Sequence, residues 1–142
     1  MDKTIEQVKN ILHTAQRWNA GLQWDDFLLA IEFHQDGTGQ MMYGECQGMR
    51  SLIDFRYEIS VDMQLRFEFF DTTADYLGQP FERTEQNAFK TVAFQLLDGP
   101  FTIDEPFDQQ HTYQHLLRFA TDPFPDGYGI WDGEVDLLDY YG

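Results

Sequence analysis

The strongest pattern in the chain is an alternation of apolar and charged residues over residues 53–69. A period of two is typical of strands that bury one face and leave the other in water. Folding this segment back around its centre sets Tyr57 opposite Phe67 on the apolar face. The same register sets Arg56 opposite Glu68 on the charged face. Because both faces favour one register, the pattern predicts an antiparallel hairpin with a tight loop.

A second hairpin is predicted around the turn residues Asp36-Gly37-Thr38-Gly39, which separate two shorter alternating segments. Setting His34 opposite Gln40 keeps apolar residues next to apolar residues. In this register Phe33 lies beside Met41. The segments before and after the turn are therefore predicted strands.

A third hairpin signal follows the strand-like residues 89–97, where Asp98-Gly99 comes directly after an apolar run. An Asp-Gly pair in this position favours a tight turn, because glycine accepts a positive φ. The turn would place Leu96 opposite Phe101. The pattern therefore predicts that the chain reverses at this dipeptide.

Between and after these hairpins the pattern is less regular. Residues 71–87 contain Gly78 and Pro80, and they are predicted to be the longest irregular stretch and a candidate mobile loop. Residues 113–120 predict a strand, with a helix as the alternative. Residues 135–138 predict a short strand or a turn within an otherwise irregular tail.

The N-terminal residues 4–19 predict the one helix of the chain. Apolar residues recur there every three or four positions, and Trp18 extends the same stripe. Thr4 followed by Gln7 is a capping-box signature for the helix start, and Gly21 is a plausible stop. A single amphipathic helix is marginal in water, so it is expected to dock on a larger element.

Together the segments predict a mainly β fold, at the margin of α+β. The expected architecture is an antiparallel meander of about seven or eight strands, closed or curved into a barrel, with one N-terminal amphipathic helix. The 142 residues suit a single domain, and no repeat or linker interrupts them. The predicted organisation is a helix at 4–19, a β meander at 28–120 and an acidic, aromatic segment at 121–142.

The arrangement resembles the calycin-like barrels, which are the lipocalins and their relatives. The resemblance rests on the strand count and on the early hairpin turn Phe33-His34-Gln35-Asp36-Gly37-Thr38-Gly39. The chain departs from the lipocalin Gly-x-Trp signature, because Gly21-Leu22-Gln23-Trp24 has one residue more. The resemblance implies a fold and does not by itself carry a function.

The charge of the chain excludes several classes of partner. With 25 acidic and 9 basic residues the formal charge is −16, which repels nucleic-acid phosphates and anionic membrane surfaces. No apolar run approaches the roughly 20 residues of a membrane helix. The first residues lack the apolar core of a signal peptide, and Cys46 is the only cysteine, so a cytoplasmic protein is expected. The same charge also fits a solubility or high-salt adaptation.

Candidate metal and catalytic sites are weak. His111 and His115 are four residues apart, and Asp132, Glu134 and Asp136 alternate in the tail. Neither set has the complete ligand spacing of a zinc or calcium motif. We expect no metal, no cofactor and no enzymatic activity, although the sequence leaves metal binding at these two sets open.

The aromatic content is the remaining unusual feature, with 13 Phe, 7 Tyr and 3 Trp residues. A phenylalanine-rich core is one explanation, and a ligand cavity inside a small barrel is the other. The second explanation makes this a binding protein for a small apolar or aromatic molecule. Its candidate ligand-binding residues come from the predicted strands and the segment before them: Trp24, Phe33, Tyr43, Phe55, Tyr57, Phe67, Phe69 and Phe94.

An alternative function is an acidic interaction module that neutralises a basic partner protein, as an immunity protein or a nucleic-acid mimic does. Aromatic side chains would anchor such a partner and carboxylates would attract it. The candidate residues lie in the tail: Asp126, Tyr128, Trp131, Asp132 and Asp136. The oligomeric state cannot be predicted from the sequence.

Overall fold

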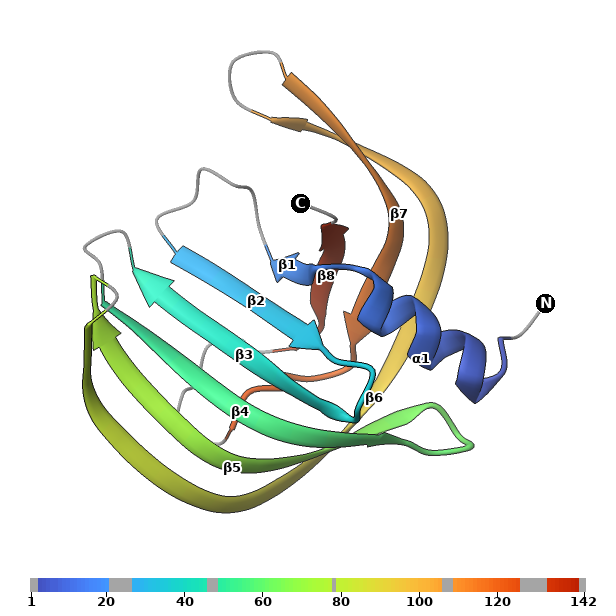
Figure 1. The fold of residues 1–142 in the computed structure, drawn as a ribbon. Coiled ribbons are helices and arrows are strands. Elements are labelled where there is room, and N and C mark those ends of the chain that lie inside the picture. Colours follow the sequence, from blue (N-terminus) through green and yellow to red (C-terminus); the bar gives the residue numbers. More distant parts are fainter. Residues whose placement is uncertain are drawn as a thin grey trace.

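The computed structural model describes residues 3–20, 27–45, 49–77, 79–105, 109–125 and 133–140, and these contain one helix and eight strands (Figure 1). The elements are α1 (Ile5–Thr14), β1 (Arg17–Ala20), β2 (Phe27–Phe33), β3 (Thr38–Glu45), β4 (Met49–Ile59), β5 (Gln64–Tyr76), β6 (Gln79–Glu105), β7 (Gln109–Phe119) and β8 (Val135–Tyr140). Each strand pairs antiparallel with the next, and β8 pairs with β1, so the sheet closes into a barrel. The predicted fold class is confirmed.

The helix begins as predicted. The Thr4 side chain accepts a hydrogen bond from the Gln7 amide at 3.1 Å, and the Gln7 side chain accepts one from the Thr4 amide at 2.9 Å. This capping box satisfies backbone donors that the first turn leaves unpaired. Val8 and Leu12 form the buried face of α1, which lies beside the end of the barrel where β2 and β3 are joined (Figure 1).

The predicted end of the helix at residue 19 is wrong, because α1 ends at Thr14. Residues 17–20 instead form β1, which hydrogen-bonds to β2 on one side and to β8 on the other. Trp18 is fully buried as its pattern indicated, but it points inward from a strand, and its indole Nε1 donates to the Leu12 carbonyl at 3.0 Å. Pairing with two strands satisfies more backbone groups than one further helical turn would, so tertiary structure overrides the local pattern.

The β4–β5 hairpin has the predicted register, with Tyr57 opposite Phe67 and Arg56 opposite Glu68. The tight loop is also confirmed. Met63 takes a φ of 59° there, the backbone region in which glycine is usual.

The β2–β3 hairpin is shifted by two residues from the prediction, because Phe33 lies opposite Gly39 and not opposite Met41. The turn is tighter than expected, since the His34 amide donates to the Thr38 carbonyl at 2.8 Å. A shift of two keeps every side chain on its predicted face. Phe33 is therefore still buried, but its neighbours across the hairpin change.

The stretch 71–87 is not a loop. Its described residues continue β5 to Tyr76 and begin β6 at Gln79, so the two strands form one long ribbon. Leu77 takes the positive φ of the turn, at 51°. Pro80 lies next to this turn, where the register shifts and a missing backbone donor is tolerated.

The predicted reversal at Asp98-Gly99 is also wrong. β6 runs through this dipeptide and pairs with β7, with Leu96 opposite Leu117 and a register shift between Asp98 and Phe101. A Cβ atom on Gly99 would lie 2.8 Å from the Tyr113 carbonyl oxygen on β7. Glycine here permits close approach of two backbones at a bulge, which uses its small size and not a turn conformation.

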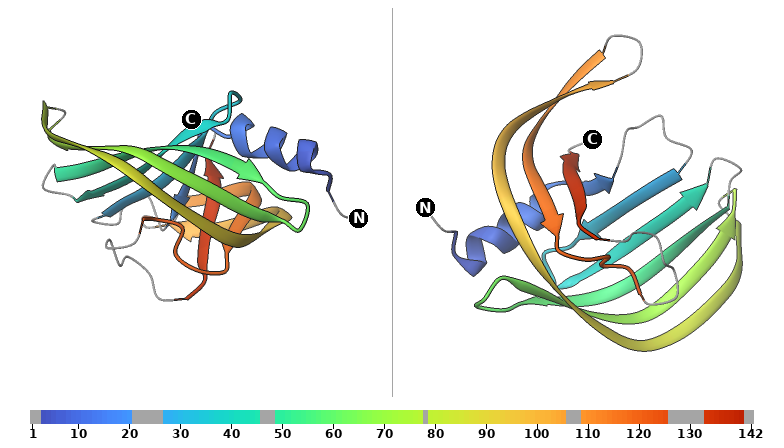
Figure 2. Two further views of the ribbon diagram at one scale, coloured as in Figure 1. Left: turned by 90° about the horizontal axis from the view of Figure 1, so that it is seen from below. Right: turned by 180° about the vertical axis from the view of Figure 1, so that it is seen from behind.

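The later strands agree with the prediction, since β7 covers residues 113–119 and β8 covers 135–138. β6 connects the two parts of the barrel: it pairs with β5 up to Ala93 and with β7 from Phe94 onward. Figure 2 shows this strand curving from one side of the molecule to the other.

Candidate functional site: the barrel mouth

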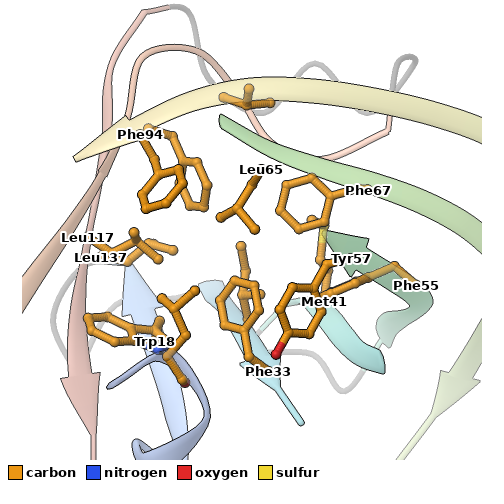
Figure 3. Close-up of a cluster of buried hydrophobic side chains, with 14 of the residues drawn as sticks. Trp18, Phe33, Met41, Phe55, Tyr57, Leu65, Phe67, Phe94, Leu117 and Leu137 are labelled. Carbon is orange, nitrogen blue, oxygen red and sulfur yellow. Dashed lines mark hydrogen bonds between the residues drawn. The ribbon is translucent and has the colours of Figure 1, made fainter. Parts of the chain in front are cut away.

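The interior of the barrel is filled at the end beside α1. Phe33, Phe55 and Phe69 lie in one row across β2, β4 and β5 and are at most 2% exposed. The Phe55 ring meets two other rings edge to face, with 5.8 Å between the centres of Phe33 and Phe55 and 5.0 Å between those of Phe55 and Phe67. The Phe69 ring stacks on that of Phe67, with 5.9 Å between their centres. Figure 3 shows the side chains of Phe33, Phe55 and Phe67, which come from different strands. This cluster forms a packed floor.

The next row along the strands is formed by Ile31, Met41, Ile53 and Thr72, which lie opposite one another in the register. The three apolar side chains are completely buried, whereas Thr72 is half-buried. The inner wall therefore begins to open at β5.

A third row lies farther from α1, and none of its side chains is fully buried. Its members also lie opposite one another across β2, β3, β4 and β5: Leu29, Tyr43, Ser51 and Ala74. We name these four residues together with Thr72 the mouth of the barrel. Along the inner face of these strands, exposure thus rises from zero in the floor to intermediate values in the mouth.

A β-bulge at Phe70 decides which β5 residues face the mouth. Phe55 pairs with Phe69 and Asp54 pairs with Asp71, so Phe70 has no partner on β4. Phe70 points outward, where the Arg56 guanidinium lies 4.4 Å from its ring centre. Two successive residues therefore face outward, and the alternation resumes with Thr72 inside.

The bulge also moves two carboxylates to the outer face. The Asp71 oxygens accept hydrogen bonds from Arg83 Nε at 2.9 and 3.1 Å, and those of Asp75 accept from Arg50 Nε at 2.9 and 3.0 Å. The Asp75 side chain is only 3% exposed, so its charge requires this partner. These acidic side chains are thus bound by arginines away from the mouth.

The mouth combines apolar surface with neutral hydroxyl groups. Leu29 and Ala74 supply the apolar part, and Tyr43, Ser51 and Thr72 supply the hydroxyls. These five residues include no histidine, cysteine or carboxylate. They offer apolar contacts and hydrogen bonds to a ligand, and no group with acid–base chemistry near neutral pH.

Most of the predicted ligand-binding residues lie in the core. Phe33, Phe55, Tyr57, Phe67, Phe69 and Phe94 are buried, Tyr43 lies in the mouth, and Trp24 lies outside the described residues. The Tyr57 hydroxyl donates to the His34 carbonyl at 2.8 Å. Burial raises the pKa of this phenol to about 12, and the negative charge of Asp36 acts in the same direction.

Four mouth residues were not among the predicted ligand-binding residues: Leu29, Ser51, Thr72 and Ala74. Leu29 could have been found, because it shares the alternation of its strand with Phe33. Thr72 and Ala74 could not, because without the bulge at Phe70 the same alternation places them on the outer face. The signal that identifies them is the register of β4 against β5.

His115 belongs to a group of ionisable side chains near Trp18, and the ring centres of His115 and Trp18 are 6.5 Å apart. Its Nδ1 lies 2.9 Å from Asp139 Oδ2, and its Nε2 lies 3.7 Å from Asp98 Oδ1. Asp98 also accepts a hydrogen bond of 2.6 Å from Lys3, which holds the pKa of the Asp98 carboxyl below its ordinary value. Within the described ranges, no group of three histidine, cysteine or acidic residues could hold a metal ion, and the His111 side chain is outside them.

Asp139 belongs to the acidic C-terminal segment, but it does not face solvent. Its side chain is completely buried, and it accepts a hydrogen bond from the Gln114 amide at 3.0 Å in addition to the contact with His115. A carboxylate in the interior needs such donors. Val135 and Leu137 are buried on the same face of β8.

Of the predicted partner-binding residues, only Asp136 is described. It is exposed, and Arg118 donates to its two oxygens at 2.8 and 3.1 Å, which raises the pKa of the guanidinium. Asp126, Tyr128, Trp131 and Asp132 lie outside the described residues.

None of the helical residues described forms a helix long and apolar enough to cross a membrane. Comparisons with family models, with curated proteins and with solved structures give no match.

Proposed function

We propose that this chain is a non-enzymatic, cytoplasmic binding protein with a calycin-like barrel that holds a small neutral molecule in its mouth. The observation that carries the proposal is the graded exposure of the inner face of β2–β5. Side chains of the floor are fully buried, whereas Tyr43, Ser51 and Thr72 are only half-buried. This step leaves apolar and hydroxyl groups of the inner face accessible to a small molecule.

The chemistry of the mouth indicates the class of ligand. Small-molecule sites are mostly apolar and contain a few polar groups that fix orientation. Leu29, Ala74 and the buried Ile31 behind them favour an apolar or aromatic body. The hydroxyls favour a ligand with one or two hydrogen-bonding groups, and the charge of −16 disfavours an anion.

The proposal can be tested by titration with the neutral apolar fluorophore N-phenyl-1-naphthylamine. We expect saturable binding with one probe per chain and a blue shift of its emission. Ala74→Trp fills the mouth from β5 and should weaken binding at least about tenfold, which corresponds to about 1.4 kcal/mol.

Thr73→Trp is the matched control, because it adds the same side chain one residue away on the outer face. It should leave probe binding unchanged. Equal effects of both variants, or the absence of saturable binding in the unmodified chain, would overturn the proposal.

A further inference from the structure

The first part of β6 is the most exposed strand segment of the described chain. Every residue from 79 to 89 whose side chain is described is exposed, including Phe81 at 57% and Phe89 at 53%. Large exposed aromatic side chains in a small domain often mark an interaction surface. Phe89 lies on the outer face, opposite Glu68 and with the Arg66 guanidinium 4.8 Å from its ring centre.

This segment also has an open edge. One edge of residues 79–89 pairs with β5, while β7 pairs with β6 only from Phe94 onward. No other strand of the described chain pairs with the second edge. Unpaired strand edges bind extended chains through backbone hydrogen bonds.

The usual protections of an edge are sparse here. Pro80 stands at the beginning of the segment, and the next nine residues contain no proline or lysine. The charge of Arg83 is already bound by Asp71. Glu82 and Glu85 are exposed, so the segment presents negative charge between two exposed phenylalanines.

We propose that residues 79–89 of β6 bind an extended, basic segment of a partner protein by β-strand addition. Charge complementarity selects this occupant. A second copy of the chain would bring a charge of −16 against −16, whereas a basic strand is attracted at long range and meets Glu82 and Glu85 at contact. The segment borders the mouth, because Glu82 and Thr84 lie opposite Ala74 and Thr72. The peptide test below measures binding at the open edge, whereas the fluorophore test measures binding in the mouth, so either proposal can fail without the other.

A test uses a fluorescently labelled seven-residue peptide that alternates lysine with valine. The matched control peptide alternates lysine with glycine, which keeps the charge but removes the preference for a strand. We expect the valine peptide to bind at least about tenfold more tightly in fluorescence anisotropy. Its addition should slow hydrogen exchange of amides in residues 79–89, and binding should weaken with added salt.

Variants of the protein locate the site. Phe81→Ser combined with Phe89→Ser should weaken the valine peptide at least about fivefold. Val61→Ser, at a residue that is 90% exposed at the β4–β5 loop, is the control and should have no effect. Equal affinity for both peptides, protection elsewhere in the chain, or self-association that strengthens with salt would each overturn the proposal.

Discussion

Tyr57 joins the packed floor to the β2–β3 turn through its hydrogen bond to the His34 carbonyl. Its pKa is raised to about 12, so the folded state favours the neutral phenol. The resulting stabilisation is complete below pH 10, the ordinary value for tyrosine, and is lost as the pH rises through about 12.

In an absorbance titration at alkaline pH, we expect one tyrosine to ionise near pH 12 while the chain remains folded. Tyr57→Phe should remove this late step. The variant should also lose less stability than the unmodified protein between pH 10 and 12. A late step that persists in Tyr57→Phe would assign the raised pKa to another tyrosine.

Gly39 is a second residue with a specific role, because a Cβ atom there would collide with the Glu32 carbonyl and the Phe55 ring. Glycine lets the large ring fill the row between Phe33 and Phe69. We expect Gly39→Ala to lower the free energy of unfolding by about 1–3 kcal/mol, as measured by chemical denaturation. In a protein that already carries Phe55→Leu, Gly39→Ala should cost less, because the smaller side chain at position 55 leaves room for the Cβ atom. An unchanged free energy of unfolding in Gly39→Ala would show that the Glu32 backbone and the Phe55 ring can move aside without loss of stability.

At the scale of elements, the bulge at Phe70 determines which face of β5 lines the barrel. Deleting Phe70 would remove the bulge but leave Phe69 opposite Phe55 and Asp71 opposite Asp54, so Thr72 would still face inward. We therefore expect the deletion variant to keep the barrel fold and to lose only modest stability, through the straightening of β5 and the lost contact with Arg56. Phe70→Ala keeps the bulge and should cost about 1 kcal/mol through the lost contact alone. Thermal unfolding of the two variants measures these effects, and loss of the fold in the deletion variant would contradict them.

The elements also show how far the sequence predicts this fold. Alternation between neighbouring residues identified the buried faces of β2, β4 and the start of β5, because it depends only on local order. The predicted β2–β3 register was wrong, because the register depends on how tightly the chain turns between His34 and Thr38. The predicted turn at Gly99 was wrong, because glycine is needed there for the close approach of the β7 backbone. Local sequence around Gly99 does not show that contact.

The candidate site was less predictable than the fold. Aromatic residues were expected to line a cavity, but the described ones are mostly floor, and only Tyr43 of the proposed set is in the mouth. The other mouth residues are small or aliphatic and are brought together by cross-strand register. Composition does not indicate such residues. The alternation along β5 would indicate which residues face inward, but the bulge at Phe70 reverses the faces that it predicts for Thr72 and Ala74.

For the whole molecule, β8 is the closing element, because it pairs with β7 on one side and β1 on the other. Removing residues 133–142 would open the barrel and expose the faces covered by Val135 and Leu137. Each buried side chain contributes roughly 1.5–3 kcal/mol, so we expect a loss of several kcal/mol in denaturant unfolding. Glu134→Ala, at an exposed position, is the control and should change stability by less than about 0.5 kcal/mol. An unchanged midpoint after truncation would contradict a closing role.

Closure of the barrel has a consequence for how the chain folds. β1 pairs with β8 through Trp18 and Asp139, at opposite ends of the sequence, whereas β4 and β5 are joined by a short loop. Bringing distant segments together costs more chain entropy than forming a local hairpin, so the two ends should meet last. In refolding kinetics we expect Phe67→Ala to slow folding and Leu137→Ala mainly to speed unfolding. During synthesis on the ribosome, the central hairpin would then form before β8 has emerged, and the barrel would close only after the last strand is available.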